Sequence, residues 1–198
     1  MNIYTNKLYV LLEKITNFFL LNLLWLICSL PIITIFPASS AMFHVINEWR
    51  VNGKSSIVKP FFLGLKKNFK LSFFSGLFFI ISFLILYYDL LLIHELLHGW
   101  AYLVTLSLLF FLMIVLAFIA TYSIPTIVFY HLSFKETIKQ SFLFSFIFFP
   151  TTILMILLFI GFVLIVLFYP IAIFLLISPI FYAFHKLVER NRRQIQQI

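Results

Sequence analysis

Charged side chains are scarce in this chain, and long stretches have none. Charged residues make up 10% of the 198 positions, and four apolar runs, residues 16–36, 71–93, 100–130 and 142–182, together contain a single one, Asp89. A helix needs roughly 20 mostly apolar residues to cross the hydrocarbon core of a bilayer, which is about 30 Å thick. The runs are apolar on every face and lack the alternation of barrel strands, so they indicate helices. This composition excludes a water-soluble globular domain and predicts an integral membrane protein.

The last apolar run is too long for one membrane crossing and suits two crossings joined by a short turn. We expect this turn between Gly161 and Pro170. The predicted fold is therefore an all-α polytopic bundle with juxtamembrane amphipathic helices, a single integral membrane domain of about five spans. The expected spans are residues 16–37, 71–93, 101–130, 142–162 and 165–185.

Cysteine and recognisable catalytic motifs are also nearly absent. A single cysteine, Cys28, excludes a disulfide framework within the chain. The sequence contains no nucleotide-binding loop, nucleophile elbow or dinucleotide fingerprint. We therefore predict no ATP-driven activity, no catalytic residue and no cofactor.

Basic residues, which give a net charge of +8, gather between the apolar runs. By the positive-inside rule, the segments that carry them lie on the cytoplasmic side of the plasma membrane. This rule places the C-terminus in the cytoplasm and, with five spans, the N-terminus outside the cell. Lys7 and Lys14 oppose that placement. The alternative is a first segment that starts in the cytoplasm and re-enters, since Pro31 and Pro37 interrupt it. The connecting and terminal basic residues are Arg50, Lys54, Lys59, Lys66, Lys67, Lys70, Lys135, Lys139, Lys186, Arg190, Arg192 and Arg193.

The expected partner of this positive charge is the anionic lipid of the bilayer. Nucleic acid is not expected, because the basic residues flank spans and belong to no recognition module. Small residues at positions 38–41 also resemble a signal-peptide cleavage site, although the preceding run is longer than the usual 7 to 15 residues.

Two basic segments precede apolar runs and are expected to form amphipathic helices at the cytoplasmic interface. Pro60 suits the first turn of one helix, and Ser133 with Glu136 forms an S-x-x-E capping box that opens the other. The segments also match at an offset of 69 residues, and this match leaves two explanations open: a parallel repeat of the kind found in transporters, or similar composition alone. The matched pairs are Lys66 with Lys135, Lys70 with Lys139, Ser72 with Ser141, and Phe73 with Phe142.

The most specific chemical motif is H-E-x-x-H, formed by His94, Glu95 and His98. On a helix, histidines four residues apart face the same way and can hold zinc while the glutamate activates water. A third protein ligand is missing: Asp89 lies about 140° around a continuous helix, which leaves His44 as the candidate. We therefore predict no metal site and keep a zinc hydrolase as an alternative.

Three residues inside the apolar runs carry an amide or a carboxyl group. Asn17 and Asn22 are expected to form hydrogen bonds across helices, because lipid offers amides no partner. Asp89 is an ionisable residue within a span, which suggests an ion-linked role, but it adjoins Tyr87 and Tyr88, a pair typical of the membrane interface.

Several segments resemble the YesL family of bacterial membrane proteins. The resemblance rests on N-L-L-W-L at Asn22 to Leu26, on S-L-P-I-I-T-I at Ser29 to Ile35 followed by Pro37 and Ala38, and on two shorter basic segments. The signature residues are Asn22, Trp25, Pro31, Pro37, Lys66, Lys67, Phe69, Lys70, Ser133, Lys135 and Glu136; Phe36 stands where family members commonly carry glycine.

The resemblance implies a membrane protein of unknown molecular activity. Members are often encoded beside carbohydrate-uptake systems, which suggests an accessory or regulatory role in sugar import and a sugar-transporter permease subunit as partner. It brings no catalytic residues. The alternatives are a small stand-alone transporter and the zinc hydrolase.

Overall fold

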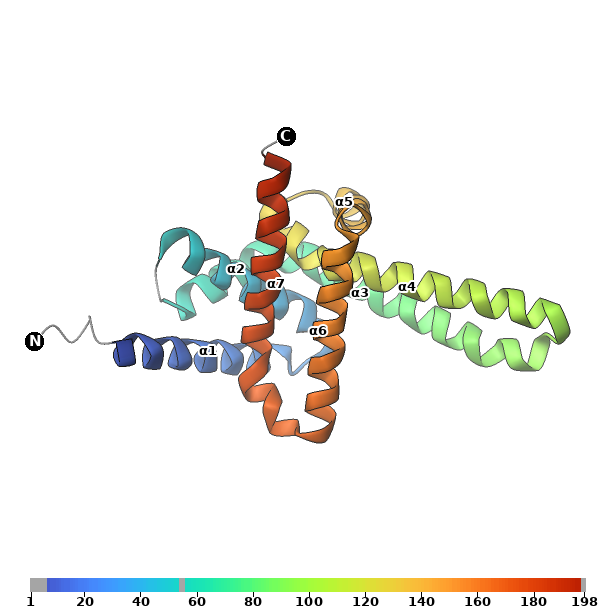
Figure 1. Cartoon of the computed structure of the whole chain (residues 1–198), viewed down its shortest axis with the longest axis horizontal. Coiled ribbons are helices and arrows are strands. Elements are labelled where there is room, and N and C mark those ends of the chain that lie inside the picture. Colours follow the sequence, from blue (N-terminus) through green and yellow to red (C-terminus); the bar gives the residue numbers. More distant parts are fainter. Residues whose placement is uncertain (1–6, 54–55, 197–198) are drawn as a thin grey trace, which may run out of the picture.

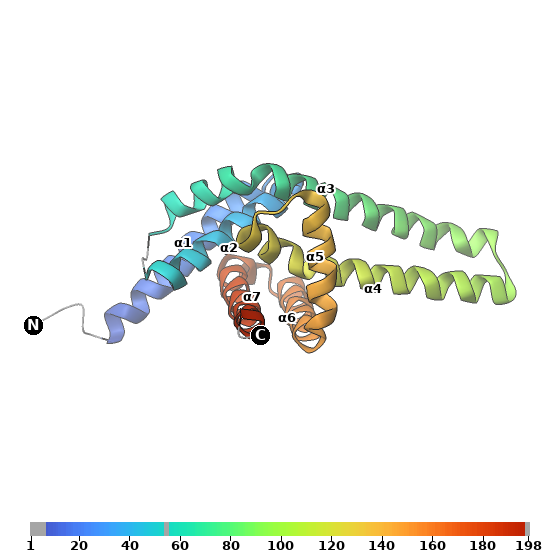
Figure 2. The same ribbon diagram turned by 90° about the horizontal axis from the view of Figure 1, so that it is seen from above.

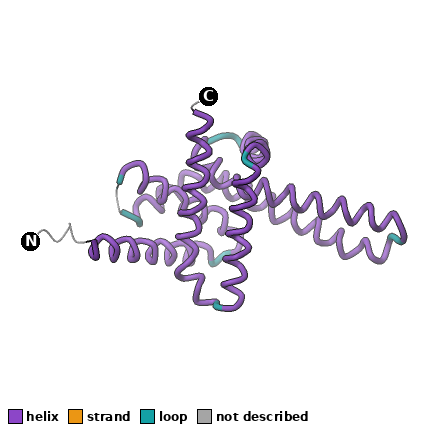
Figure 3. Tube along the Cα trace, in the orientation of Figure 1, coloured by secondary structure: helices purple, strands orange, loops and turns teal. Residues whose placement is uncertain are grey.

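The computed structural model describes residues 7–53 and 56–196, without the side chains of residues 7–11, 94, 195 and 196. These two segments are almost entirely helical and contain no strand (Figure 3). Five helices within them are long and apolar enough to cross a membrane. The predicted all-α membrane fold is confirmed.

The first predicted span is divided between two helices. Helix α1 covers Lys7–Ser29, a 3-10 turn η2 covers Ile32–Thr34, and helix α2 covers Ile35–Asn52. The predicted single span 16–37 is therefore wrong at both ends. The break occurs at Pro31, which precedes η2, while Pro37 lies within the first turn of α2, where proline is tolerated.

Helix α2 returns alongside α1 and forms the centre of the molecule. The ring of Phe18 on α1 contacts that of Trp49 near the end of α2, and Trp25 reaches Ser39 near its start, so the two helices are antiparallel. Ten consecutive residues of α2, Pro37–Ile46, are buried. The small residues at 38–41 are thus buried and helical, whereas a cleavage site must be accessible. The sequence analysis did not predict α2 as a helix.

Helix α3 (Val58–Leu96) and helix α4 (Gly99–Tyr130) form a long antiparallel hairpin (Figures 1 and 2). The predicted basic helix and the span 71–93 are one continuous helix of 39 residues, about 58 Å long at 1.5 Å per residue. This length exceeds the bilayer core. The second half of α3 and the first half of α4 project away from the other helices, and we call this projecting part the α3–α4 arm.

The last third of the chain contains the helices α5 (Phe134–Ile147), α6 (Phe149–Phe168) and α7 (Ile173–Gln196). The predicted capping box is confirmed: the Ser133 hydroxyl accepts from the Glu136 amide, and the Glu136 carboxylate accepts from the Ser133 amide. The turn between the last two spans lies at Tyr169–Ala172, so Gly161 is inside α6 and the predicted spans 142–162 and 165–185 begin too early.

The apolar helices point along two directions. In both views α3 and α4 follow the long axis of the molecule, while α6 and α7 run across it and are seen nearly end-on in Figure 2. The first residues of α1 also lie at the same end of the α1–α2 pair as the α2–α3 connection (Figure 1). The start of α1 and the basic α2–α3 connection therefore lie on the same side of this pair, which is the arrangement of the alternative with a re-entrant first segment.

The suspected repeat has a counterpart in helix packing. Asn68 and Ser72 on α3 are buried, as are Thr137 and Ser141, 69 positions later on α5. Helix α2 covers the first of these faces and the end of α4 covers the second. The correspondence ends there, because α3 continues without a break whereas α6 starts in a new direction after α5, with Pro150 in its first turn.

Candidate functional site

Helix α7 carries the densest polar contacts of the described residues. Its first half binds α1 through Asn22, and its second half binds α2 and α4 through residues between His185 and Arg193. We call these contacts the α7 junction.

Asn22 inserts its amide into the backbone of α7. The side-chain Nδ2 donates to the Phe174 carbonyl at 2.8 Å, and Oδ1 accepts from the Ser178 amide at 2.7 Å. Phe174 and Ser178 are four residues apart, so a regular helix would join these two groups directly. The next residue, Pro179, lies inside α7 and has no amide hydrogen to donate to the carbonyl one turn earlier. Asn22 therefore bridges two backbone groups of one helical turn beside a proline, and its predicted cross-helix bonding is confirmed.

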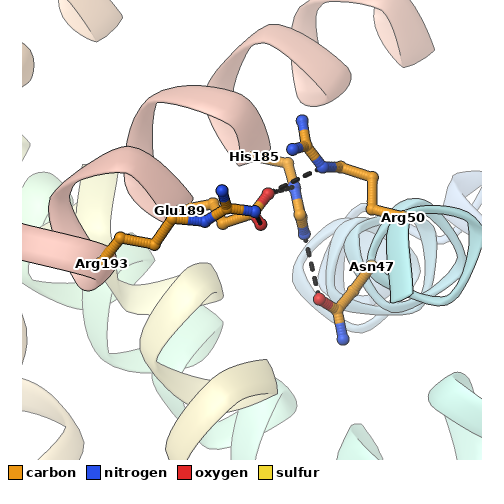
Figure 4. Close-up of polar contacts among 5 residues, drawn as sticks. All are labelled: Asn47, Arg50, His185, Glu189 and Arg193. Atoms are coloured by element: carbon orange, nitrogen blue, oxygen red, sulfur yellow. Dashed lines mark hydrogen bonds and ion pairs between the residues drawn. The ribbon is translucent and has the colours of Figure 1, made fainter. Parts of the chain in front are cut away.

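Glu189 is the centre of a charged cluster in the second half of α7 (Figure 4). Its carboxylate forms an ion pair with Arg50, 2.7 Å from Nε, and accepts a hydrogen bond from Arg193 Nη2 at 2.6 Å. Arg50 comes from the end of α2, so this contact ties α2 to α7. The Glu189 side chain is 13% exposed, and such partly buried pairs resist salt screening more than surface pairs do.

His185 lies one helical turn before Glu189 and is almost fully buried. Its Nε2 is 3.1 Å from Asn47 Oδ1, and its Nδ1 is 3.7 Å from the Glu189 carboxylate. An amide oxygen accepts hydrogen bonds, so Nε2 carries the proton in this arrangement. The ring lies between Phe43 and Phe129. No serine, threonine or cysteine hydrogen-bonds this histidine in the described residues, so the cluster does not form a nucleophile–base pair.

A second polar link joins α7 to α4. Asn191 Nδ2 donates to the Tyr122 hydroxyl at 3.0 Å, and the guanidinium of Arg192 lies 4.7 Å from the centre of the Phe129 ring. A cation held over an aromatic face is attracted by its quadrupole. The α7 junction thus fixes one helix against three others, and its chemistry is that of a structural clamp.

The H-E-x-x-H motif does not lie on one helix. Helix α3 ends at Leu96, and both Leu97 and His98 have extended backbone angles before Gly99, whose φ is +66°. The two histidines therefore lack the shared helical face that zinc binding would use. The side chain of His94 lies outside the described residues. Among those described, no group of three His, Cys, Asp or Glu side chains could hold a metal.

The other predicted polar residues are dispersed. Asp89 is exposed on the α3–α4 arm beside Tyr87 and Tyr88, whose rings contact each other. Asn17 is half-buried on α1 and makes no cross-helix hydrogen bond to another described residue. His44, the third zinc ligand considered, lies in the buried part of α2, far along the chain and in the fold from the arm tip. Burial lowers the pKa of His44. The negative charge of Glu48 raises this pKa, whereas Lys67 and His131 lower it further.

Most signature residues of the resemblance are exposed, and those on α1 and α2 contribute to packing. Trp25 donates to the Ser39 hydroxyl at 3.0 Å, which ties α1 to α2, and Pro31 sets the break between these helices. The basic residues and Phe69 are exposed along α3 and at the start of α5. At the capping box, hydrogen bonds from Ser133 lower the pKa of Glu136.

Sequence reasoning missed the charged cluster of the α7 junction. A signal was present, because His185, Glu189 and Arg193 follow one another at intervals of four and share one helix face. The contribution of Arg50 had no local signal, since it comes from a helix 139 positions earlier.

An apolar cleft of about 420 Å³ lies between α3 and α4 at the base of the α3–α4 arm. Aromatic side chains and two alanines line it, among them Phe79, Phe83, Phe110, Ala117 and Ala120. The side chains that line the cleft provide apolar surface to a ligand and no polar group.

Comparison with known proteins gives one family. Residues 18–90 match a family described as a protein of unknown function, DUF624. The matched segment runs from the middle of α1 through α2 and most of α3. It contains Asn22 and Arg50, whereas their partners on α7 lie beyond it. No curated protein and no solved structure matches the chain.

Proposed function

We propose that this protein is an accessory or regulatory membrane component that binds a partner membrane protein through the α3–α4 arm. The observation that carries the proposal is the form of the arm: it projects from the clamped helices, and large apolar side chains cover its outer faces. Exposed examples include Phe83, Leu84, Val104, Leu108 and Phe111. A projecting apolar hairpin suits contact with a partner's transmembrane helices.

The partner we propose is a permease subunit of a carbohydrate-uptake system in the plasma membrane. The YesL resemblance supports this choice, and the basic surface supports a cytoplasmic placement of the α2–α3 connection and the C-terminus. Since α1 begins near that connection, we also propose a cytoplasmic N-terminus. No enzymatic activity is proposed.

Site-specific photo-crosslinking tests the role of the arm. Phe111 on α4 and Phe159 on α6 are 60% and 52% exposed, so benzoylphenylalanine at either position faces the surroundings of the protein. We expect the Phe111 variant to form an adduct with a permease subunit in native membranes, identified by mass spectrometry. The Phe159 variant should give none. Identical adduct patterns from both positions, or lipid adducts alone, would contradict the proposal.

A stand-alone transporter is the second candidate, favoured by buried polar groups between α2 and α3. It predicts solute flux in liposomes that depends on Asp89, and absence of flux across a panel of sugars and ions would count against it. The zinc hydrolase stays a prediction of the motif. It requires about one zinc per chain, lost in His94→Ala.

A further inference from the structure

Among the described residues, five of the nine buried polar side-chain atoms without a hydrogen-bond partner lie on α2 and α3. Ser40 Oγ and His44 Nε2 lie on α2, and Asn68 Nδ2, Ser72 Oγ and Ser75 Oγ lie on α3. Each of these residues is at most 7% exposed. We call the five residues the α2–α3 seam. Buried polar atoms in native proteins nearly always have a hydrogen-bond partner, either protein or ordered water.

Two close contacts bracket the seam. A Cβ atom on Gly64 would lie 2.7 Å from Cδ2 of His44, and one on Gly76 would lie 2.7 Å from Cβ of Phe36. Each glycine therefore lets α2 approach the backbone of α3 more closely than any other residue would. The two helices touch at both ends of the seam.

The contacts fix which residues face one another. Ser40 lies midway between Phe36 and His44 on α2, and Asn68 and Ser72 lie between Gly64 and Gly76 on α3. Because residues four apart share a helix face, Ser40 is level with the gap between Asn68 and Ser72. The unpartnered groups of the two helices therefore lie along one line between α2 and α3.

The mixture of groups determines which ligand fits. Asn68 Nδ2 requires an acceptor, while hydroxyls and a neutral imidazole can each donate or accept. A bare cation would serve the acceptors alone and would repel the amide hydrogens. Water both donates and accepts, so it can bind every group of the seam.

We propose that the α2–α3 seam is an internal hydration site, in which water molecules bind between α2 and α3 from His44 to Ser75. Water enters at the His44 end, where Glu48, Lys67 and His131 provide charged and polar neighbours. The other end is closed by Phe36, which packs over Gly76 and stacks on Phe79 with ring centres 5.4 Å apart.

Radiolytic hydroxyl-radical labelling in ¹⁸O water tests the proposal on the wild-type protein, because bound water yields radicals beside the residues it touches. His185 is the comparison residue: it is also a buried histidine, at 1% exposed, but its Nε2 is paired with Asn47 and its Nδ1 lies 3.7 Å from the Glu189 carboxylate. We expect several-fold more oxidation of His44 than of His185. Equal protection of the two rings would overturn the proposal.

Alanine substitution gives a second readout. Ser72→Ala removes a hydroxyl from the seam, and Ser141→Ala removes the corresponding hydroxyl of α5, which is bonded to Thr126. If water binds Ser72, both variants lose a hydrogen bond, and each lowers the unfolding midpoint by about 2–4 °C. A Ser72→Ala variant with an unchanged or higher midpoint would show a dry seam and refute the inference.

Discussion

The bridge between Asn22 and α7 leads to a quantitative prediction. Asn22→Leu keeps the size of the side chain but removes its donor to Phe174 and its acceptor for Ser178. A buried hydrogen bond contributes about 0.5–1.5 kcal/mol net, and side-chain bonds between membrane helices average about 0.6 kcal/mol. The two bonds together predict a loss of about 1–3 kcal/mol in the free energy of unfolding.

Asn17→Leu is the matched control, because Asn17 lies on the same helix and has no cross-helix bond to a described residue. We expect it to change stability little. The measurement is unfolding in mixed micelles with increasing SDS, followed by circular dichroism and tryptophan fluorescence. If both substitutions cost the same, the loss would reflect a general effect of asparagine on α1, and the bridging argument would fail.

The proline makes the prediction sharper. Pro179→Ala restores an amide and allows α7 to become regular, so that Phe174 and Ser178 can bond directly. The cost of Asn22→Leu should then be smaller in the Pro179→Ala background. A double-mutant cycle measures this coupling, and strict additivity of the two substitutions would contradict a bridge that depends on the proline.

Three further predictions concern charge and capping. Glu189→Gln should lower the free energy of unfolding by about 1–3 kcal/mol, between the values for surface and buried ion pairs, because it leaves Arg50 without its carboxylate partner. Chemical unfolding measures this loss, and an unchanged midpoint would refute the clamp. Ser133→Ala should lower the free energy of unfolding by about 1 kcal/mol, because it removes the cap of α5. The loss should appear as a lower unfolding midpoint, whereas Lys135→Ala on the same helix should change the midpoint little. Burial lowers the pKa of His44 below its unfolded value of 6.5, so the unfolded state binds more protons below that pH and stability falls as the pH drops through this range. His44→Gln should reduce the slope of stability against pH below about 6.5, and an unaltered slope would exclude His44 as a contributor.

Elements with strong local signals could be predicted from the sequence. Helix α4 lies within two residues of its expected span, because an uninterrupted apolar run admits one conformation in lipid. The cap at Ser133 was equally accessible, since a capping box is a contact between residues three apart. Asn22 was correctly expected to bond across helices, though its partners on α7 could not be named.

Elements that depend on neighbours could not be predicted. Helix α2 carries His44, Glu48 and Arg50, so its composition resembles that of a surface segment, yet ten of its residues are buried by other helices. The boundary between α5 and α6 was also missed, because the apolar run continues across Phe148 and Phe149 while the chain changes direction.

The sequence by itself determined that this is a helical membrane protein, since apolar runs of sufficient length have no other stable state in a bilayer. It also determined where the basic surface lies along the chain. Tertiary structure alone decided that α6 and α7 cross the line of α3 and α4, that Asn22 bridges α7, and that Arg50 meets Glu189. The physical reason is the distance along the chain: periodicity and capping act within one helix, whereas the Asn22 and Arg50 contacts join residues more than a hundred positions apart.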